Sequence, residues 1–362
     1  MLAMVVVNNP GSWSHVYAPL KHAAWNGLTP TDLIFPFFLF IVGVSLHIST
    51  GHAIHAAQPL PWTKFLRRSA LLIALGIFLN AFPFFPGFDP AQWRLTGVLQ
   101  RIGLCFILAC AIIDLARRIN APLSTAVLAI LVAYGLIVGS PLHDFDAIIL
   151  RNTDLRFLPK GHFYKGSLID PEGLLSTIPA TASVLLGYLA ARVALPLGSL
   201  IQFTNVFRLL GLSLVLTTCG GLLHASHSNP INKIIWSPAF ALITAGLAGV
   251  SLAALLLLEC PANSPSARAA AMILRPFSIA GRNAILLFVA SGMLARILNL
   301  IVWNTPQGLL APFREHAFTA LSSIGPAANN PELASLTYAL FVLAFWWAVL
   351  WWLDRRSIHL KL

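Results

Sequence analysis

The pattern of hydrophobic and polar positions divides this chain into long apolar segments separated by polar connections. A helix needs about 20 mainly apolar residues to cross a bilayer, and segments approaching this length recur along the chain. The pattern therefore predicts an all-α fold, a polytopic transmembrane helical bundle of about ten spans. The opening apolar run Met1–Val7 is too short, so we expect a truncated first span; the others are residues 32–50, 68–86, 97–116, 122–140, 174–195, 205–223, 236–258, 277–299 and 333–353.

One stretch departs from this pattern. Residues 301–320 are less apolar and contain Arg314, Glu315 and His316, so we predict an interfacial or re-entrant segment there. Neither end of the sequence has the composition of a soluble domain. We therefore treat residues 1–362 as a single integral membrane domain.

The composition supports a membrane protein and suggests an orientation. Hydrophobic residues make up 57% of the chain and charged residues only 10%, whereas soluble domains carry roughly 25% charged residues. The formal net charge is +11, but no basic helix stands out, and we predict no nucleic-acid partner. Lys and Arg gather in alternate loops, which predicts that those loops are cytoplasmic. The loops at 10–31 and 141–173 then face outward.

A polar island at Lys21–Asp32 precedes the apolar segment 33–43. Ionisable groups at a membrane boundary are costly unless they are used or paired. His22 can exchange a proton near neutrality, and a loop of ten residues lets Asp32 face its ring, as in a general base or an activated nucleophile. The alternative is an interfacial histidine and a helix-capping aspartate. Asn8 ends the first apolar run, where it is either a helix stop or a polar group near His22.

Other polar groups stand at the predicted span entries. Gln100 and Arg101 suggest a cavity or an anionic cofactor, although an arginine here can also snorkel to the interface. Arg282 and Asn283 suggest a lined cavity in a later span. Asp170 and Glu172 stand before another predicted span, where they either cap the helix or bind a cationic amine. Lys233 and Trp236 stand at the start of a further span, and the tryptophan either anchors the helix at the membrane interface or stacks on a sugar ring. No nucleotide, metal or CxxC motif is present, and we predict no metal.

Several of these motifs together resemble the heparan-α-glucosaminide N-acetyltransferase family, specifically its compact bacterial members. The most specific is the stretch His22-Ala23-Ala24-Trp25-Asn26-Gly27-Leu28-Thr29 with Asp32; the others are Asn8-Asn9, Gly97–Arg101, Asp170–Gly173, Asn232-Lys233 with Trp236-Ser237, and Gly281–Asn283. The resemblance implies a multispan enzyme of the bacterial inner membrane. It would take acetyl from acetyl-CoA on the cytosolic side and deliver it to a terminal glucosamine amine on the periplasmic side.

The resemblance also assigns roles to residues. His22 matches the active histidine of the family, Asp32 its partner, and Asn8 the asparagine at the end of the first helix. Whether the histidine is acetylated or acts only as a base stays open. Family members usually carry an Asp-x-x-Arg-Gly-like element before the first apolar run, so we expect the true start to lie upstream of Met1. A homodimer would fit the family.

These observations combine into one hypothesis about the site. His22, Asp32 and Asn8 are the predicted catalytic residues; the predicted cofactor-binding residues are Gln100, Arg101, Arg282 and Asn283, and the predicted aminosugar-binding residues are Trp25, Asn26, Asp170, Glu172, Lys233 and Trp236. The rival hypothesis is a secondary transporter for aminosugars or their oligomers, in which His22 and Asp32 would relay a proton.

Overall fold

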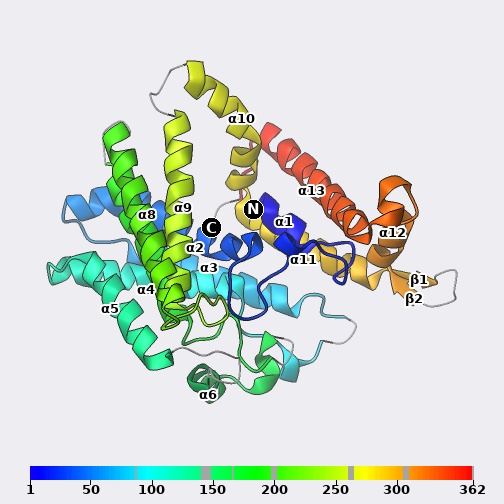
Figure 1. Ribbon diagram of the computed structural model, residues 1–362, viewed down its shortest axis with the longest axis horizontal. Coiled ribbons are helices and arrows are strands. Elements are labelled where there is room, and N and C mark those ends of the chain that lie inside the picture. Colours follow the sequence, from blue (N-terminus) through cyan, green and yellow to red (C-terminus); the bar gives the residue numbers. More distant parts are fainter. Residues whose placement is uncertain are drawn as a thin grey trace.

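The computed structural model describes residues 1–85, 88–139, 148–164, 167–196, 202–259, 265–304 and 310–360. These residues are almost entirely helical, which confirms the predicted all-α class (Figure 1). The elements are α1 Leu2–Asn8, α2 Ile34–His55, α3 Trp62–Ala81, α4 Val98–Arg118, α5 Leu123–Val138, α6 Ile148–Phe157, α7 Thr177–Ala194, α8 Phe203–Ala225, α9 Pro238–Glu259, α10 Pro265–Arg282, α11 Ala284–Leu300, β1 Val302–Asn304, β2 Leu310–Pro312, α12 Phe313–Leu321 and α13 Pro331–Arg355.

The helices that could span a membrane are identified by their length and composition. Six helices of the described residues are long and apolar enough to cross a bilayer: α2 with its preceding turn, α4, α7, α8, α9 and α13. The pair α10–α11 makes a seventh if it is counted as one broken span. α5 has only 16 residues, and α3 begins at Trp62 and carries three basic residues in its first two turns. The predicted number of about ten spans therefore stays a prediction.

Two helices that are distant in sequence, α2 and α7, pack with their backbones in close contact. A Cβ atom on Gly43 would lie 1.9 Å from the Val184 carbonyl oxygen, and one on Gly187 would lie 2.0 Å from the Phe40 carbonyl oxygen. Only glycine permits this approach, as is common where membrane helices cross. The contact places the start of α2, and hence Asp32, beside the start of α7.

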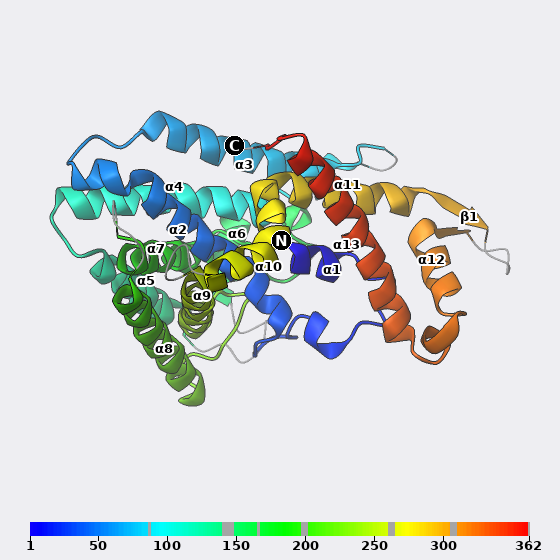
Figure 2. The ribbon, with the colours of Figure 1, turned by 90° about the horizontal axis from the view of Figure 1, so that it is seen from above.

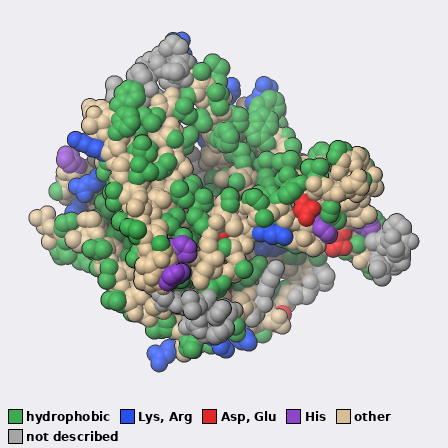
Figure 3. Space-filling model, viewed as in Figure 1, with side chains coloured by type: hydrophobic (Ala, Val, Ile, Leu, Met, Phe, Trp, Pro, Cys, Tyr) green, Lys and Arg blue, Asp and Glu red, His purple; other side chains and the backbone are tan. Residues whose placement is uncertain are grey.

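The hydrophobic interior has a large part and a smaller one. The larger cluster joins α2, α3, α4, α5, α7, α8 and α9, whereas the smaller one joins α1, α10, α11 and α13. Figure 2 shows this second group beside the first, with α12 and the β1–β2 hairpin at its outer end. The exterior in the view of Figure 3 is rich in hydrophobic side chains and poor in charged ones, as expected for a surface in lipid.

The structure adds three local features that the hydropathy pattern did not reveal. The predicted span 277–299 is broken: α10 and α11 meet at Asn283 with a bend of 68°. Within 301–320, β1 pairs antiparallel with β2 and the short helix α12 follows, while residues 305–309 lie outside the described residues; an interfacial or re-entrant segment there stays a prediction. The outer loop 141–173 contains a helix, α6, that the hydropathy pattern did not reveal. Residues 141–147, 165 and 166 of that loop lie outside the described residues.

Candidate active site

The centre of the candidate site is a contact between His22 and Asp32. Asp32 lies in a short 3-10 turn, Pro30–Leu33, directly before α2, and its side chain is buried. Its Oδ1 atom lies 2.7 Å from Nδ1 of His22, whose side chain is 53% exposed. The structure therefore forms the contact that the sequence predicted, with the rest of the imidazole open to solvent.

The second carboxylate oxygen of Asp32 orders the loop that carries His22. Oδ2 accepts hydrogen bonds from the Ala23 and Thr29 backbone N–H groups, both at 3.1 Å, and from the Thr29 hydroxyl at 3.0 Å. The bond from Thr29 N–H is half of a capping box at the start of the turn. Asp32 is therefore both the partner of His22 and part of a helix cap, so the two readings of the sequence are not exclusive.

Lys233 completes this group from the loop before α9. Its Nζ atom lies 2.9 Å from Nδ1 and 3.4 Å from Nε2 of His22, and 3.3 Å from Oδ1 of Asp32. An atom nearly equidistant from both ring nitrogens lies against the face of the imidazole, not along either in-plane lone pair. Nδ1–H can therefore donate to Asp32 while Lys233 contacts the carboxylate from the side. Burial lowers the pKa of Lys233, against the opposing influence of Asp32 and Glu172.

Residues next to Lys233 form hydrogen bonds to the polar island at Lys21–Asp32. The Asn232 side chain is fully buried; its Nδ2 donates to Oδ1 of Asn26 at 3.2 Å, and its Oδ1 accepts from the backbone of Ile234 and Ile235. The Gly27 N–H donates to the Ile231 carbonyl at 2.8 Å. The bonds from Asn232 to Asn26 and from Gly27 to Ile231 connect positions more than 200 residues apart, and the sequence contained no signal for this register.

Trp25 and Trp236 occupy different environments. Trp25 is half-buried beside a small hydrophobic cluster that contains Ile169 and Ile235. Trp236 is fully buried: Phe35 and Phe240 pack edge-on against it, and its Nε1–H donates to the Ser183 hydroxyl. The Trp236 ring is therefore neither an interface anchor nor an open sugar platform in this conformation, because its surface is already covered by the core.

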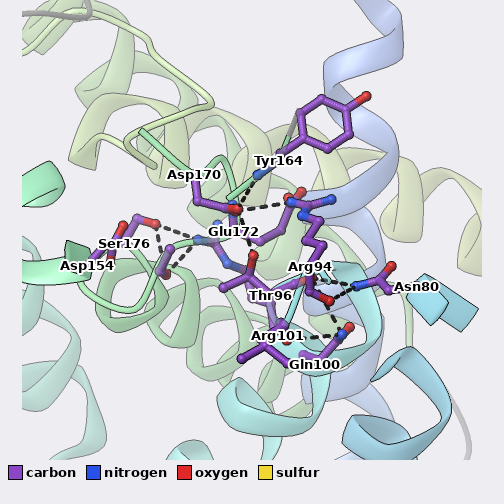
Figure 4. A network of polar contacts seen from close by, with 12 residues as sticks. Asn80, Arg94, Thr96, Gln100, Arg101, Asp154, Tyr164, Asp170, Glu172 and Ser176 are labelled. Carbon is purple, nitrogen blue, oxygen red and sulfur yellow. Dashed lines mark hydrogen bonds and ion pairs between the residues drawn. The ribbon is translucent and has the colours of Figure 1, made fainter. Parts of the chain in front are cut away.

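Figure 4 shows a second polar cluster, which gathers around Arg94 and Asp170. Arg94 forms ion pairs with Asp170, at 3.0 Å, and with Glu172, and its guanidinium lies over the Tyr164 ring. Burial alone would raise the pKa of Asp170, but the charge and hydrogen bond of Arg94 hold it below its ordinary value. Arg94 was not singled out in the sequence, and it neutralises much of the predicted amine site. Glu172 still acts on Lys233 through its charge.

Arg101 and Gln100 of α4 form hydrogen bonds to the backbone of this cluster. Arg101 is buried; its Nη2 donates to the Gly173 carbonyl at 3.0 Å and to the Ser176 hydroxyl, while Nε and Nη1 have no hydrogen-bond partner among the described residues. Gln100 donates to the carbonyls of Leu95 and Thr96. Both predicted cofactor residues therefore fix the turns that carry Arg94 and Asp170, and neither faces an open surface.

A buried acid that the sequence analysis missed supports the same turn. Asp154 of α6 is 1% exposed, and its Oδ1 accepts the Leu174 N–H at 2.8 Å. Burial raises the pKa of Asp154 to about 6, and the charge of Asp170 adds to the effect. Asp154 appeared in the sequence only as one of several loop acids, because nothing in the pattern revealed α6.

The remaining predicted residues do not contact His22 or Asp32 directly within the described residues. Asn8 ends α1 on an exposed surface, and within the described residues its side chain makes no hydrogen bond to His22 or Asp32. Arg282 pairs with Asp354 at 2.8 Å. Asn283 bonds to the backbone of Ile358 and Leu360. Arg282 and Asn283 thus fasten the end of the chain to the α10–α11 bend, and they do not join Gln100 and Arg101 in one cavity.

A basic cavity lies at the far end of α2. Its volume is about 780 Å³, and its wall includes His47, His55, Arg117 and Arg192. His47 is 15 residues beyond Asp32, which corresponds to roughly 20 Å along a helix. The Nδ1 atom of His47 is buried and has no hydrogen-bond partner in the part of the chain that the structure describes. Arg117 pairs with Asp114, whereas no carboxylate of the described residues pairs with Arg192. These cations fit an anionic group such as a phosphate.

Comparison with known proteins agrees with these motifs. The family described as "Heparan-alpha-glucosaminide N-acetyltransferase, catalytic" matches residues 12–215, which include His22, Asp32 and Asp170. The human protein named heparan-alpha-glucosaminide N-acetyltransferase is 28% identical over 303 residues, covering 66% of this chain and 44% of the human one. The mouse protein of the same name is 34% identical over 116 residues, covering 31% of this chain and 17% of its own. The matches thus span less than half of these relatives.

Proposed function

This chain belongs to the heparan-α-glucosaminide N-acetyltransferase family, and we propose that it transfers acetyl from acetyl-CoA to the amine of a terminal glucosamine or related aminosugar. The observation that carries this proposal is the half-exposed imidazole of His22 held by the buried carboxylate of Asp32. We also propose that residues 1–362 act as a single membrane domain. The donor, the acceptor and the roles of individual residues are parts of the proposal.

His22 and Asp32 have the geometry of a base with an orienting acid. When Nδ1–H donates to Asp32, the lone pair of Nε2 is left on the exposed edge of the ring. Nε2 can take a proton from the aminosugar ammonium, and the free amine then attacks the acetyl carbonyl, so that the C–S bond breaks, the thiolate leaves and the C–N bond of the product forms. Alternatively, Nε2 itself attacks the acetyl carbonyl and the thiolate leaves; the amine of the acceptor then attacks the acetyl-imidazole, the bond to Nε2 breaks and the C–N bond of the product forms.

The surroundings of His22 suit an aminosugar. Trp25 and Asn26 lie three and four residues along the same loop, Lys233 places a positive charge beside the imidazole, and Glu172 acts on Lys233 through its charge. We assign the acceptor hydroxyls to Asn26 and Lys233 and its amine to the side of Glu172. Asn8 and Asn26 are the proposed donors to the developing oxyanion.

The basic cavity at the far end of α2 suits the phosphates of the donor. Arg192 and Arg117 would bind them as cations, and His47 offers an unpartnered ring nitrogen. A donor bound here would have its thioester directed toward His22 along α2. The arrangement agrees with the predicted orientation, in which the Arg117 and Arg192 end is cytoplasmic and the His22 loop faces the periplasm of a bacterial inner membrane.

The test is acetyl transfer by the purified protein in detergent, with labelled acetyl-CoA and glucosamine. His22→Ala should abolish transfer while the protein stays monodisperse with an unchanged Tm. His15→Ala is the matched control, because His15 lies in the same loop and contacts Ser12 and Phe318 instead of Asp32. Wild-type rates in His22→Ala would refute the proposal. Proton-coupled uptake of glucosamine into liposomes without CoA would instead establish the transporter alternative.

A further inference from the structure

A long apolar groove separates α5 from α8. Its volume is about 950 Å³, and α7 and α9 form its floor. Both ribbon views show α5 beside the α8–α9 pair (Figures 1 and 2). One face of α5 lines the groove at helical spacing: Ser124, Val127, Leu128, Leu131, Val132, Gly135 and Leu136. The opposite wall is formed by positions of α8 that include Leu209, Leu212, Ser213 and Leu216.

The groove has the dimensions of a site for one hydrocarbon chain. The lining positions of α5 extend over 12 residues, or roughly 18 Å. This length slightly exceeds half of the roughly 30 Å hydrocarbon core of a bilayer. The lining is mostly apolar, and Arg192 is its only charged residue among the described ones. Leu128 and Leu136 on the rim are 63% and 80% exposed, so the groove is open along its side.

One end of the groove leads to the loop of the candidate site. Ser228, Asn229 and Pro238 line that end, and Lys233 lies between them in sequence. Lys233 is four positions after Asn229, so the two are at most roughly 14 Å apart. Lys233 contacts His22, and Ile231 bonds to Gly27 of the His22 loop. A molecule seated in the groove can therefore extend one or two sugar units to His22.

We infer that the acceptor of this enzyme is an aminosugar linked to an apolar chain, with the chain in the α5–α8 groove and the amine at His22. This inference rests on the proposed function and names its substrate class. A free sugar has no apolar part for such a groove. A chain held there would orient the amine and raise its effective concentration at His22, so the gain appears as rate.

The experiment compares two acceptors, free glucosamine and an alkyl glucosaminide with a 12-carbon chain, on the protein in nanodiscs. The wild type should acetylate the alkyl acceptor with at least a tenfold higher kcat/KM. Leu212→Trp and Val132→Trp fill the groove and should abolish this preference while leaving transfer to glucosamine unchanged. Val215→Trp is the matched control, because Val215 lies on α8, is 57% exposed and does not line the groove.

The outcomes separate this inference from the proposed function. Equal kcat/KM for the two acceptors, or a preference that survives in both groove variants, would overturn the groove assignment alone. Absence of transfer to either acceptor would refute the proposed function itself. A photoreactive group at the end of the alkyl chain should label peptides of α5 and α8 in the wild type and in Val215→Trp. Labelling confined to other helices would also overturn the assignment.

Discussion

The Nδ1 atom of His22 lies 2.7 Å from Oδ1 of Asp32, and the other oxygen of the same carboxylate binds three donors of the His22 loop. One buried side chain therefore fixes both the imidazole and the backbone that carries it. Removing the Asp32 side chain therefore changes both the orientation of the ring and the stability of the loop. Replacing Asp32 by asparagine changes mainly the charge beside the ring, so a comparison of the asparagine and alanine variants separates the two effects.

Asp32→Asn keeps an acceptor oxygen but removes the charge that favours the Nδ1–H tautomer of His22. We expect kcat to fall by roughly 10²–10⁴, as when a triad carboxylate becomes an amide, with little change in Tm. Asp32→Ala should lower kcat and also Tm, because Ala23 and Thr29 lose their acceptor. The acetyl-transfer rate and the Tm of each variant test these two expectations. An Asp32→Asn enzyme with wild-type kcat would contradict the assigned role.

Lys233 should control the alkaline side of the pH–rate profile. Burial lowers its pKa from the ordinary 10.5, so the ammonium beside His22 loses its proton at a lower pH than an exposed lysine does. We expect activity to change with an inflection below pH 10.5 in the wild type, and the inflection to disappear in Lys233→Met. Lys21→Met, at the exposed lysine next to His22, is the control. A profile that Lys233→Met leaves unchanged would exclude this role.

Asp154 should make stability depend on pH. Its pKa is raised from 3.8 to about 6 in the folded protein, so the folded state binds more protons and stability falls as pH rises from about 4 to 6. Asp154→Asn retains an oxygen for the Leu174 N–H and removes the buried charge. The variant should be more stable above pH 6, by up to about 3 kcal/mol, and equal to the wild type near pH 4. The test is the Tm of the wild type and of Asp154→Asn, measured from pH 4 to above pH 6. A difference in Tm between the two proteins that does not change with pH would refute the explanation.

Gly43→Ala should disrupt the packing of α2 against α7. The new Cβ would meet the Val184 carbonyl oxygen at 1.9 Å, and backbone atoms cannot move aside without separating the helices. We expect a loss of at least about 3 kcal/mol, the upper end of the overpacking range, with loss of activity. Gly211→Ala on α8 is the control, because no atom lies within 4 Å of its added Cβ. The control should stay within about 1 kcal/mol of wild type; a similar Tm for both variants would contradict the packing argument.

Hydropathy in the sequence located the helices well because each apolar segment must be buried or face lipid wherever it lies. Helix boundaries were predicted to within several residues for α2, α4, α5, α7, α8, α9 and α13. The break between α10 and α11 was missed because Arg282 and Asn283 look like polar residues inside one span. Their partners, Asp354 and the backbone of residues 358 and 360, lie far along the chain.

The site was predicted where its parts are close in sequence and missed where they are not. His22 and Asp32 are ten residues apart, so a single loop brings them together and the sequence by itself determined their contact. Lys233 against His22, Arg94 between Asp170 and Glu172, and the burial of Trp236 were decided only by the tertiary structure. The physical reason is that these contacts depend on how the ends of separate helices meet, which hydrophobic periodicity does not encode.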